Sequence, residues 1–182
     1  MKRISVAILI LLAVTAGLFA NGDGEVETAA LEGYSRVADE GLSFDLQWQI
    51  DGGNLKVQIA APTTGWVAVG FDAENKMAGA NILIGYVADG AAFLRDDFGS
   101  AQVKHESDTG LGGSENFSEL EGEETDGVTV LRFTIPLDSG DAFDKPLEPG
   151  KSYKVIYAYG PAGKDDFGSY HTKTRGSFEL TL

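Results

Sequence analysis

A strict alternation of apolar and polar residues begins at Leu42. In the stretch LSFDLQWQI, every second residue from Leu42 to Ile50 is apolar. Successive side chains of a strand point to opposite faces, so this pattern predicts a β-strand with one buried face. The residues DGGN then supply a turn, and LKVQIAA (55–61) resumes the alternation. The sequence therefore predicts a β-hairpin at the start of the folded domain.

Further strands are predicted along the rest of the chain, and helices are not. The segments GWVAVGF (65–71) and ANILIGYVA (80–88) are almost continuously apolar, as in central strands that are buried on both faces. Further candidates are AAFLRDD (91–97), VTVLRFTIPL (128–137), KSYKVIYAYG (151–160) and RGSFELTL (175–182). After residue 20 no helical run carries capping residues. The predicted fold class is all-β, an antiparallel β-sandwich over residues 42–182.

The polar segments between these strands suggest turns and loops. Residues 99–127 are rich in Gly, Ser, Asp and Glu, which predicts a long loop with at most one short strand. The five residues DDFGS occur twice, at 96–100 and 165–169. We interpret them as two similar acidic turns that each bury a phenylalanine. Their aspartate pairs are candidate calcium ligands, but the D-x-D-x-D-G spacing of a dedicated loop is missing, which favours simple solvation.

The first twenty residues are typical of a secretory signal peptide. Lys2 and Arg3 form a basic start, Ile4–Phe19 is apolar, and the small residue Ala20 precedes a polar segment. We expect cleavage after Ala20 and export to the periplasm or the extracellular space. An uncleaved membrane anchor is the alternative, although the apolar stretch is shorter than the roughly 20 residues of a membrane span. The acidic residues 21–41 are predicted to be a linker or an arm.

Charge and cysteine content limit the possible partners and sites. The formal net charge of −14 disfavours binding to nucleic acid or to anionic lipid, and it suits either a solvated surface or a basic partner. The chain has no cysteine, which excludes disulfides, thiolate metal sites and covalent haem attachment through C-x-x-C-H.

Residues for catalysis are scarce. The only histidines are His105 and His171, and neither is accompanied by a G-x-S-x-G nucleophile elbow or a phosphate-binding loop. Nothing in the sequence supports a glycosidase-like pair of carboxylates. We therefore expect a protein that is not an enzyme.

Met77 and His171 are the most distinctive candidate ligands. Met77 is the only internal methionine and lies in the polar loop ENKMAGAN, whereas methionine usually fills apolar cores. Each residue follows a strongly apolar strand, so parallel strands would bring both to one end of the sandwich. A thioether and an imidazole can take the two axial positions of a haem iron. The residues available for apolar walls are Trp66, Phe71, Tyr86, Phe98, Tyr157, Tyr159 and Phe167. From the residues alone, a packed methionine and an exposed histidine remain the alternative.

Three blocks in the sequence resemble the DOMON domain, the family that includes the cytochrome domain of cellobiose dehydrogenase. They are TTGWVAVGFDAENKMAGANILIGYV (63–87), VTVLRFTIPLDSGD (128–141) and VIYAYGPAGKDDFGSYHTKTRG (155–176). The resemblance implies an immunoglobulin-like β-sandwich that holds one b-type haem non-covalently, with Met77 and His171 as the axial ligands of its iron. His105, in a polar segment, is expected to be exposed. Lys173 and Arg175 follow His171 and are candidates to pair with the haem propionates.

The resulting expectation is an exported b-type cytochrome that exchanges electrons with a separate redox protein such as an oxidoreductase. A membrane contact is expected only if the N-terminal segment stays uncleaved. Because some members of the family bind sugars, the alternative is a carbohydrate- or small-ligand-binding module without haem. In that alternative, Trp66 and Tyr86 would form a stacking platform and Met77 would only pack.

Overall fold

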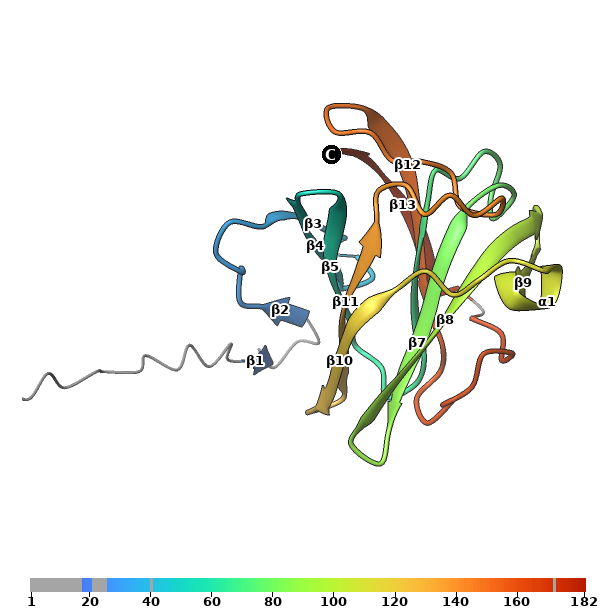
Figure 1. The fold of residues 1–182 in the computed structure, drawn as a ribbon. Helices are drawn as coiled ribbons and strands as arrows, with labels where there is room; N and C mark the ends of the chain where they lie inside the picture. Colours follow the sequence, from blue (N-terminus) through green and yellow to red (C-terminus); the bar gives the residue numbers. More distant parts are fainter. Residues whose placement is uncertain (1–17, 21–25, 40, 172) are drawn as a thin grey trace, which may run out of the picture.

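The computed structural model describes residues 18–20, 26–39, 41–171 and 173–182, and strands dominate it (Figure 1). A small two-stranded sheet near the N-terminus pairs β1 (Leu18–Ala20) with β2 (Val26–Thr28). The remaining strands form two antiparallel sheets, so the predicted all-β antiparallel sandwich is confirmed. Most of the expected signal peptide lies outside the described residues. Among the residues that are described, no helix is both long and apolar enough to cross a membrane.

One layer is a five-stranded sheet in the order β10-β11-β5-β4-β3. Its strands are β3 (Ser35–Asp39), β4 (Phe44–Asp51), β5 (Asn54–Ala61), β10 (Ser118–Thr125) and β11 (Val128–Pro136). The predicted first hairpin is β4 and β5, with Asp51 opposite Asn54. The edge strand β3 comes from the segment that was expected to be a linker or an arm, so part of that segment belongs to the sandwich.

The other layer is a six-stranded sheet in the order β13-β12-β6-β7-β8-β9. Its strands are β6 (Val67–Phe71), β7 (Asn81–Ala88), β8 (Ala91–Ala101), β9 (Lys104–Ser107), β12 (Ser152–Tyr159) and β13 (Arg175–Thr181). The prediction of a long loop over residues 99–127 was wrong. This region contains the end of β8, all of β9, the short helix α1 (Asp108–Leu111) and β10.

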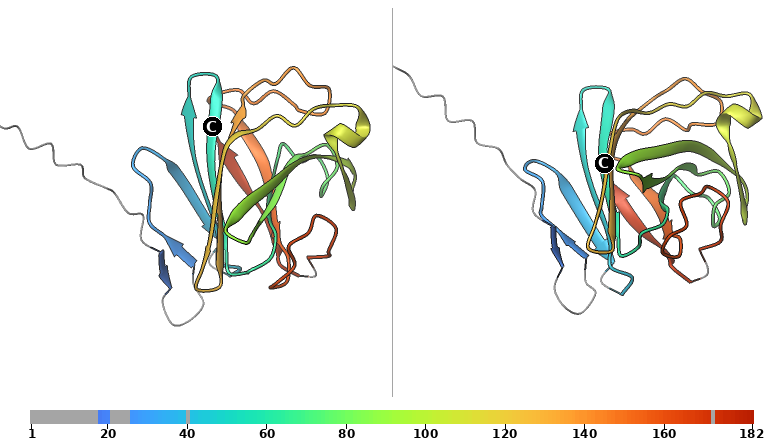
Figure 2. Two further views of the ribbon diagram at one scale, coloured as in Figure 1. Left: turned by 60° about the horizontal axis from the view of Figure 1, so that its bottom comes forward. Right: turned by 90° about the horizontal axis from the view of Figure 1, so that it is seen from below.

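The main core lies between the two sheets, which face each other as two layers (Figure 2). Alternation along each strand decides which residues enter it. In β6, Val67, Val69 and Phe71 point inward and are almost completely buried. Their neighbours Ala68 and Gly70 therefore point to the outer face of the six-stranded sheet. The core thus leaves small residues on the outer face of a central strand.

That outer face carries a second apolar cluster. Trp66, Ala68, Ile82 and Ile84 are buried there, although they do not belong to the core between the sheets. They are covered in part by the segment that follows β12, since Phe167 packs on the same cluster. An antiparallel sheet usually leaves one face to solvent. Here that face is apolar and only partly covered, so it is able to bind a ligand.

Candidate functional site

A cavity of about 440 Å³ opens on the outer face of the six-stranded sheet. Its size lies within the roughly 300–1,000 Å³ that is typical of small-molecule and cofactor sites. The floor consists of apolar side chains and small residues on three neighbouring strands, namely Ala68, Gly70, Ile82, Ile84, Ile156 and Ala158. A flat, apolar ligand could lie against such a floor without meeting a buried polar group.

The hollow depends on the small residues of the floor. A Cβ atom at Gly70 would lie 2.9 Å from Cγ1 of Ile156 and 3.0 Å from Cγ1 of Ile82, closer than ordinary contact. Ala68 and Ala158 face each other in the β6–β12 register. Larger side chains at these positions would occupy the cavity itself. The small side chains of glycine and alanine therefore leave the space above the floor open to a ligand.

Met77 lies in the connection between β6 and β7, which is held against the β8–β9 hairpin. The N–H of Met77 donates to the carbonyl of Gln102 at 3.4 Å, and its own carbonyl accepts from the N–H of Ala80 at 3.1 Å. Gly99 permits this close approach, because a Cβ there would fall 1.7 Å from the Met77 carbonyl oxygen. The thioether at the cavity is thus carried on a loop whose backbone is fixed by several contacts.

His171 lies at the other end of the cavity, in the segment between β12 and β13. This segment is fastened to Trp66, whose N–H donates to the Lys164 carbonyl at 3.0 Å and whose Nε1 donates to Ser169 Oγ at 3.0 Å. The rings of Trp66 and His171 meet edge to face, with their centroids 6.2 Å apart. The buried indole therefore serves as an anchor for the segment that carries the imidazole.

Met77 and His171 both line the cavity, but not for the reason expected from the sequence. The expectation required β6 and β12 to run in the same direction, and they pair antiparallel. Met77 follows the end of β6, whereas His171 follows the end of β12, which lies beside the start of β6. The two side chains thus reach one cavity from opposite ends of its floor. This arrangement places a thioether and an imidazole on two sides of the same space.

His105 also lines the cavity, which corrects the expectation of an exposed histidine in a long loop. It lies on β9 with its side chain 25% exposed, and its Nδ1 is 2.5 Å from Oδ2 of the buried Asp97. Arg95 donates to the same carboxylate through Nε and Nη2, at 2.5 and 2.6 Å. Burial alone would raise the pKa of Asp97, but the hydrogen bonds from His105 and Arg95 outweigh it and keep the pKa below its usual value.

His105 and Met77 belong to the same end of the cavity. The turn between β8 and β9 contains Gln102, which binds the Met77 backbone, and His105 follows it by three residues. A pair of axial ligands must lie on opposite sides of a metal ion. The geometry therefore favours His171, rather than His105, as the counterpart of Met77.

Only some of the predicted aromatic residues of the site reach the cavity. Trp66 lines the cavity, as does the predicted cation Arg175. Phe71 and Tyr159 do not, and their assignment to the site is corrected, because their strand positions point them into the core between the sheets. Tyr86 is on the outer face but lies beyond the cavity, where it stacks on Phe93 with ring centroids 5.1 Å apart.

Three cations line the cavity of a chain whose net charge is strongly negative. They are Lys76, Lys154 and Arg175. Arg175 was predicted, but the two lysines were missed. Lys154 could have been found from the sequence, because it has the same strand parity as Ile156 and Ala158 and so points outward. Nη1 of Arg175 lies 3.4 Å from Nδ1 of His171. A ligand that carries carboxylates would find positive charge here.

Comparisons with known proteins bear on the family and the fold of the chain. The family model of the DOMON domain matches residues 41–160, a range that includes Met77 but ends before His171. The mouse protein "DBH-like monooxygenase protein 1" is 31% identical over 147 residues, which cover 80% of this chain and 23% of that protein. Its human counterpart is 27% identical over 176 residues, covering 96% of this chain and 27% of the relative. The chain thus spans about a quarter of the length of these relatives.

Two solved structures share the fold. The cytochrome b domain of pyranose dehydrogenase from Coprinopsis cinerea superimposes with a TM-score of 0.60 at 12% identity, over 91% of this chain and 88% of that one. The cytochrome domain of cellobiose dehydrogenase from Myriococcum thermophilum gives 0.54 at 8% identity, over 84% and 90%. At these identities the likeness concerns the fold alone.

Proposed function

This chain belongs to the DOMON domain family, and we propose that it is a b-type cytochrome module that holds one haem non-covalently and exchanges electrons with a partner protein. Met77 and His171 are the proposed axial ligands. The module has no catalytic role of its own in this proposal. Its longer relatives carry further sequence, so the proposal concerns the domain described here.

The observation that carries the proposal is that Met77 and His171 line one cavity with an apolar floor and approach it after the ends of two antiparallel strands. A thioether and a neutral imidazole are established axial ligands of haem iron in electron-transfer proteins. Both side chains are partly buried and both are carried by backbone that hydrogen bonds hold in place. Fixed ligands on two sides suit a cofactor that changes charge without changing its coordination.

The other residues of the cavity fit the remaining parts of a haem. The floor of Ala68, Gly70 and Ala158 offers an apolar surface of low relief, which would exclude water from the ring. Lys76, Lys154 and Arg175 can pair with propionate carboxylates. Bound in this way, the haem would supply one-electron redox chemistry, and the thioether ligand would raise its reduction potential.

Electron transfer to a partner fits the surface and the expected location. The net charge of −14 favours encounter with a basic redox protein through a small, transient interface. Export through the N-terminal segment remains part of the proposal, since most of that segment lies outside the described residues.

The alternative of a carbohydrate-binding module receives less support from the structure. Its stacking platform was to be Trp66 and Tyr86. Trp66 is only 3% exposed, and its Nε1 is bonded to Ser169, so its ring face is not available to a sugar. Tyr86 already stacks on Phe93.

Titration with haemin tests the proposal directly. The purified chain should bind one equivalent and develop the sharp visible bands of a six-coordinate, low-spin haem. Ala158→Phe, which fills the floor of the cavity, should weaken binding by about tenfold or more. Ala91→Phe, an exposed position on β8 outside the cavity lining, is the matched control and should bind like the wild type. Absence of binding by the wild type, or equal binding by Ala158→Phe, would contradict the proposal.

A further inference from the structure

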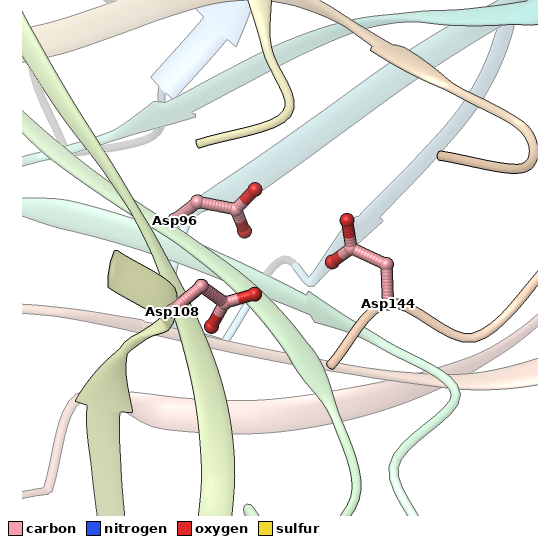
Figure 3. Close-up of side chains that lie close together, drawn as sticks. All are labelled: Asp96, Asp108 and Asp144. Atoms are coloured by element: carbon pink, nitrogen blue, oxygen red, sulfur yellow. The ribbon is translucent and has the colours of Figure 1, made fainter. Parts of the chain in front are cut away.

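Three buried carboxylates meet at a second place in the molecule, outside the lining of the cavity. Asp96 lies on β8, Asp108 is the first residue of α1, and Asp144 lies in the connection between β11 and β12. Their carboxylates point toward a shared space (Figure 3). They come from three different elements, and Asp144 follows Asp108 by 36 positions, so the tertiary fold brings the three together.

These side chains are removed from solvent and lack the partners that buried carboxylates normally have. Asp96 and Asp108 are 0% exposed and Asp144 is 9% exposed. Neither carboxylate oxygen of Asp108 has a hydrogen-bond partner, and one oxygen each of Asp96 and Asp144 is likewise without one. The other oxygen of Asp96 accepts from the N–H of Asn116 at 2.9 Å. Across the described ranges, none of the three forms an ion pair with a basic side chain.

Such an arrangement is costly unless a positive charge balances it. A buried charge that is neither paired nor hydrogen bonded is strongly disfavoured, and three neighbouring carboxylates also repel one another. In the absence of a counter-charge, burial raises the pKa of Asp96 to about 8 and that of Asp108 to about 7, and neighbouring carboxylates add to both shifts. The fold nevertheless holds all three groups in one place.

The spacing of the oxygens is that of a coordination shell. One oxygen from each of the three side chains lies within 4.8 Å of the other two. Calcium binds oxygen at 2.3–2.6 Å, so two ligands on opposite sides of the ion are separated by up to about 4.6–5.2 Å. Three oxygens around one ion therefore satisfy the observed limit.

Asn116 lies beside the cluster and satisfies two of its oxygens. Its backbone N–H donates to Oδ2 of Asp96, and its side-chain amide nitrogen is placed to donate to the Ser114 carbonyl and to Oδ2 of Asp144 at 3.1 Å. In the described part of the chain, no donor reaches either carboxylate oxygen of Asp108 or the Oδ1 atoms of Asp96 and Asp144. These four buried oxygens are the ones that a bound cation could satisfy.

We propose that Asp96, Asp108 and Asp144 bind one calcium ion. Carboxylate and amide oxygens are the ligands that hard divalent cations prefer. A site assembled from a strand, a helix start and a loop can adjust its distances, which suits calcium better than the near-ideal octahedron that magnesium demands. The interpretation of Asp96 as a solvated acidic residue was wrong, because its side chain is completely buried.

The ion would fasten the outer segments of the sandwich to each other. It would join the β11–β12 connection to β8 and α1, close to the aromatic contact between Phe143 of that connection and Phe98 of β8, whose ring centroids are 5.6 Å apart. The residue after Asp144 is Lys145, whose Nζ is 2.9 Å from Oε1 of Glu74 in the connection that carries Met77. The site is therefore structural in character and does not depend on whether the cavity binds haem.

Calorimetric titration of the chelator-treated full chain with calcium chloride tests the proposal. We expect one ion per chain with a dissociation constant of about 10⁻⁶–10⁻³ M, and weaker binding of magnesium chloride. Asp108→Asn keeps the shape of the side chain but removes its charge, and it should weaken calcium binding by about tenfold or more. Asp144→Asn should weaken calcium binding to a similar extent, and this second variant keeps the test valid if Asp108→Asn fails to fold.

The matched control comes from the second DDFGS segment. Asp165 occupies the position equivalent to Asp96 but is exposed and lies outside the cluster, so Asp165→Asn should bind calcium like the wild type. The melting temperature should rise with calcium for the wild type and for this control, but not for Asp108→Asn. Absence of calcium binding by the wild type, magnesium binding of equal or greater strength, or equal binding by Asp108→Asn would each overturn the proposal.

Discussion

The two DDFGS segments share all five residues and differ in almost everything else. Residues 96–100 belong to β8, and both of their aspartates are 0% exposed. Residues 165–169 form an irregular, largely exposed stretch between β12 and β13. Each segment nevertheless supports one end of the cavity. The first contacts Met77 through Gly99, and the second holds Trp66 next to His171 through Ser169.

The difference shows that the surroundings decide what each residue does. Asp97 binds Arg95 and His105, whereas its counterpart Asp166 accepts hydrogen bonds from the N–H groups of Gly168 and Ser169. The expectation of two similar turns was therefore wrong for the first segment, which is a strand. In residues 96–100 these side chains form a buried ion pair and pack closely, whereas in residues 165–169 they close a local loop through backbone hydrogen bonds.

The largest difference in stability between the two segments should follow from substituting their glycines, Gly99 and Gly168. Gly99→Ala would place a Cβ 1.7 Å from the Met77 carbonyl, and the backbone on both sides must then move. We expect a loss of about 3 kcal/mol in unfolding free energy, or roughly 6–12 °C in melting temperature. At Gly168 the nearest atom would be 3.9 Å away, so Gly168→Ala should change stability by less than about 0.5 kcal/mol. Thermal unfolding of both variants checks this, and equal losses would refute the close approach at Gly99.

Substitution of the second aspartate of each segment, Asp97 or Asp166, should give a smaller but clear difference in stability. Asp97→Asn leaves Arg95 and His105 without the buried carboxylate that binds both. Because these two partners are partly exposed, we expect a loss of about 2 kcal/mol rather than the full cost of a broken buried pair. Asp166→Asn should have little effect on global stability. Chemical denaturation of the two variants gives the comparison, and an unchanged midpoint for Asp97→Asn would contradict this account of the ion pair.

For the serines, Ser100 and Ser169, the second DDFGS segment should be the more sensitive one. Ser169 accepts a hydrogen bond from the buried indole of Trp66, whereas the hydroxyl of Ser100 donates to the exposed Glu106. Ser169→Ala should therefore cost about 1 kcal/mol, and Ser100→Ala close to nothing. Indole fluorescence should shift only in Ser169→Ala, since Trp66 loses its partner there. The opposite ranking of the two variants would show that the second segment does not anchor Trp66.

The smallest effect concerns acid. Hydrogen bonds from the N–H groups of Gly168 and Ser169 hold the pKa of Asp166 below its usual value. A carboxylate with a lowered pKa in the folded state stabilises that state above its unfolded pKa, and the contribution is lost as the pH falls through the folded value. The amide signals of residues 168 and 169 should therefore titrate in NMR spectra with a midpoint below about 3.9. A midpoint at or above that value would exclude these hydrogen bonds in solution.

Much of the fold could be predicted from the sequence, because the strands show as local alternation of apolar and polar residues or as short apolar runs. The pairing of β4 with β5 follows from LSFDLQWQI and the turn after it, and the buried strands β6 and β7 follow from their apolar runs. Most of β8 was predicted, but its last residues and β9 were missed, because they are largely polar and β9 is an edge strand. Apolar periodicity reports burial, and edge strands bury little.

The site was predictable in part for the same reason. Met77 and His171 stand out by residue type and by their places after apolar strands, but the direction of those strands depends on sheet topology, which no local pattern contains. Parity along β6 and β12 would have excluded Phe71 and Tyr159. Asp96 was a candidate calcium ligand from its acidic pair, but Asp108 and Asp144 could not have been found, because the three residues show no metal-binding spacing and Asp144 joins them only through the tertiary fold.

The central claim is that Met77 and His171 hold a haem iron between them, and the visible spectrum of haem-loaded histidine variants tests it most directly. His171→Ala should lose stable haem binding or leave a high-spin iron with an open position, while His105→Ala should keep the low-spin spectrum because His105 lies on the same side as Met77. Met77→Ala should retain some haem at a lower reduction potential. A low-spin spectrum that survives in His171→Ala but is lost in His105→Ala would contradict the claim.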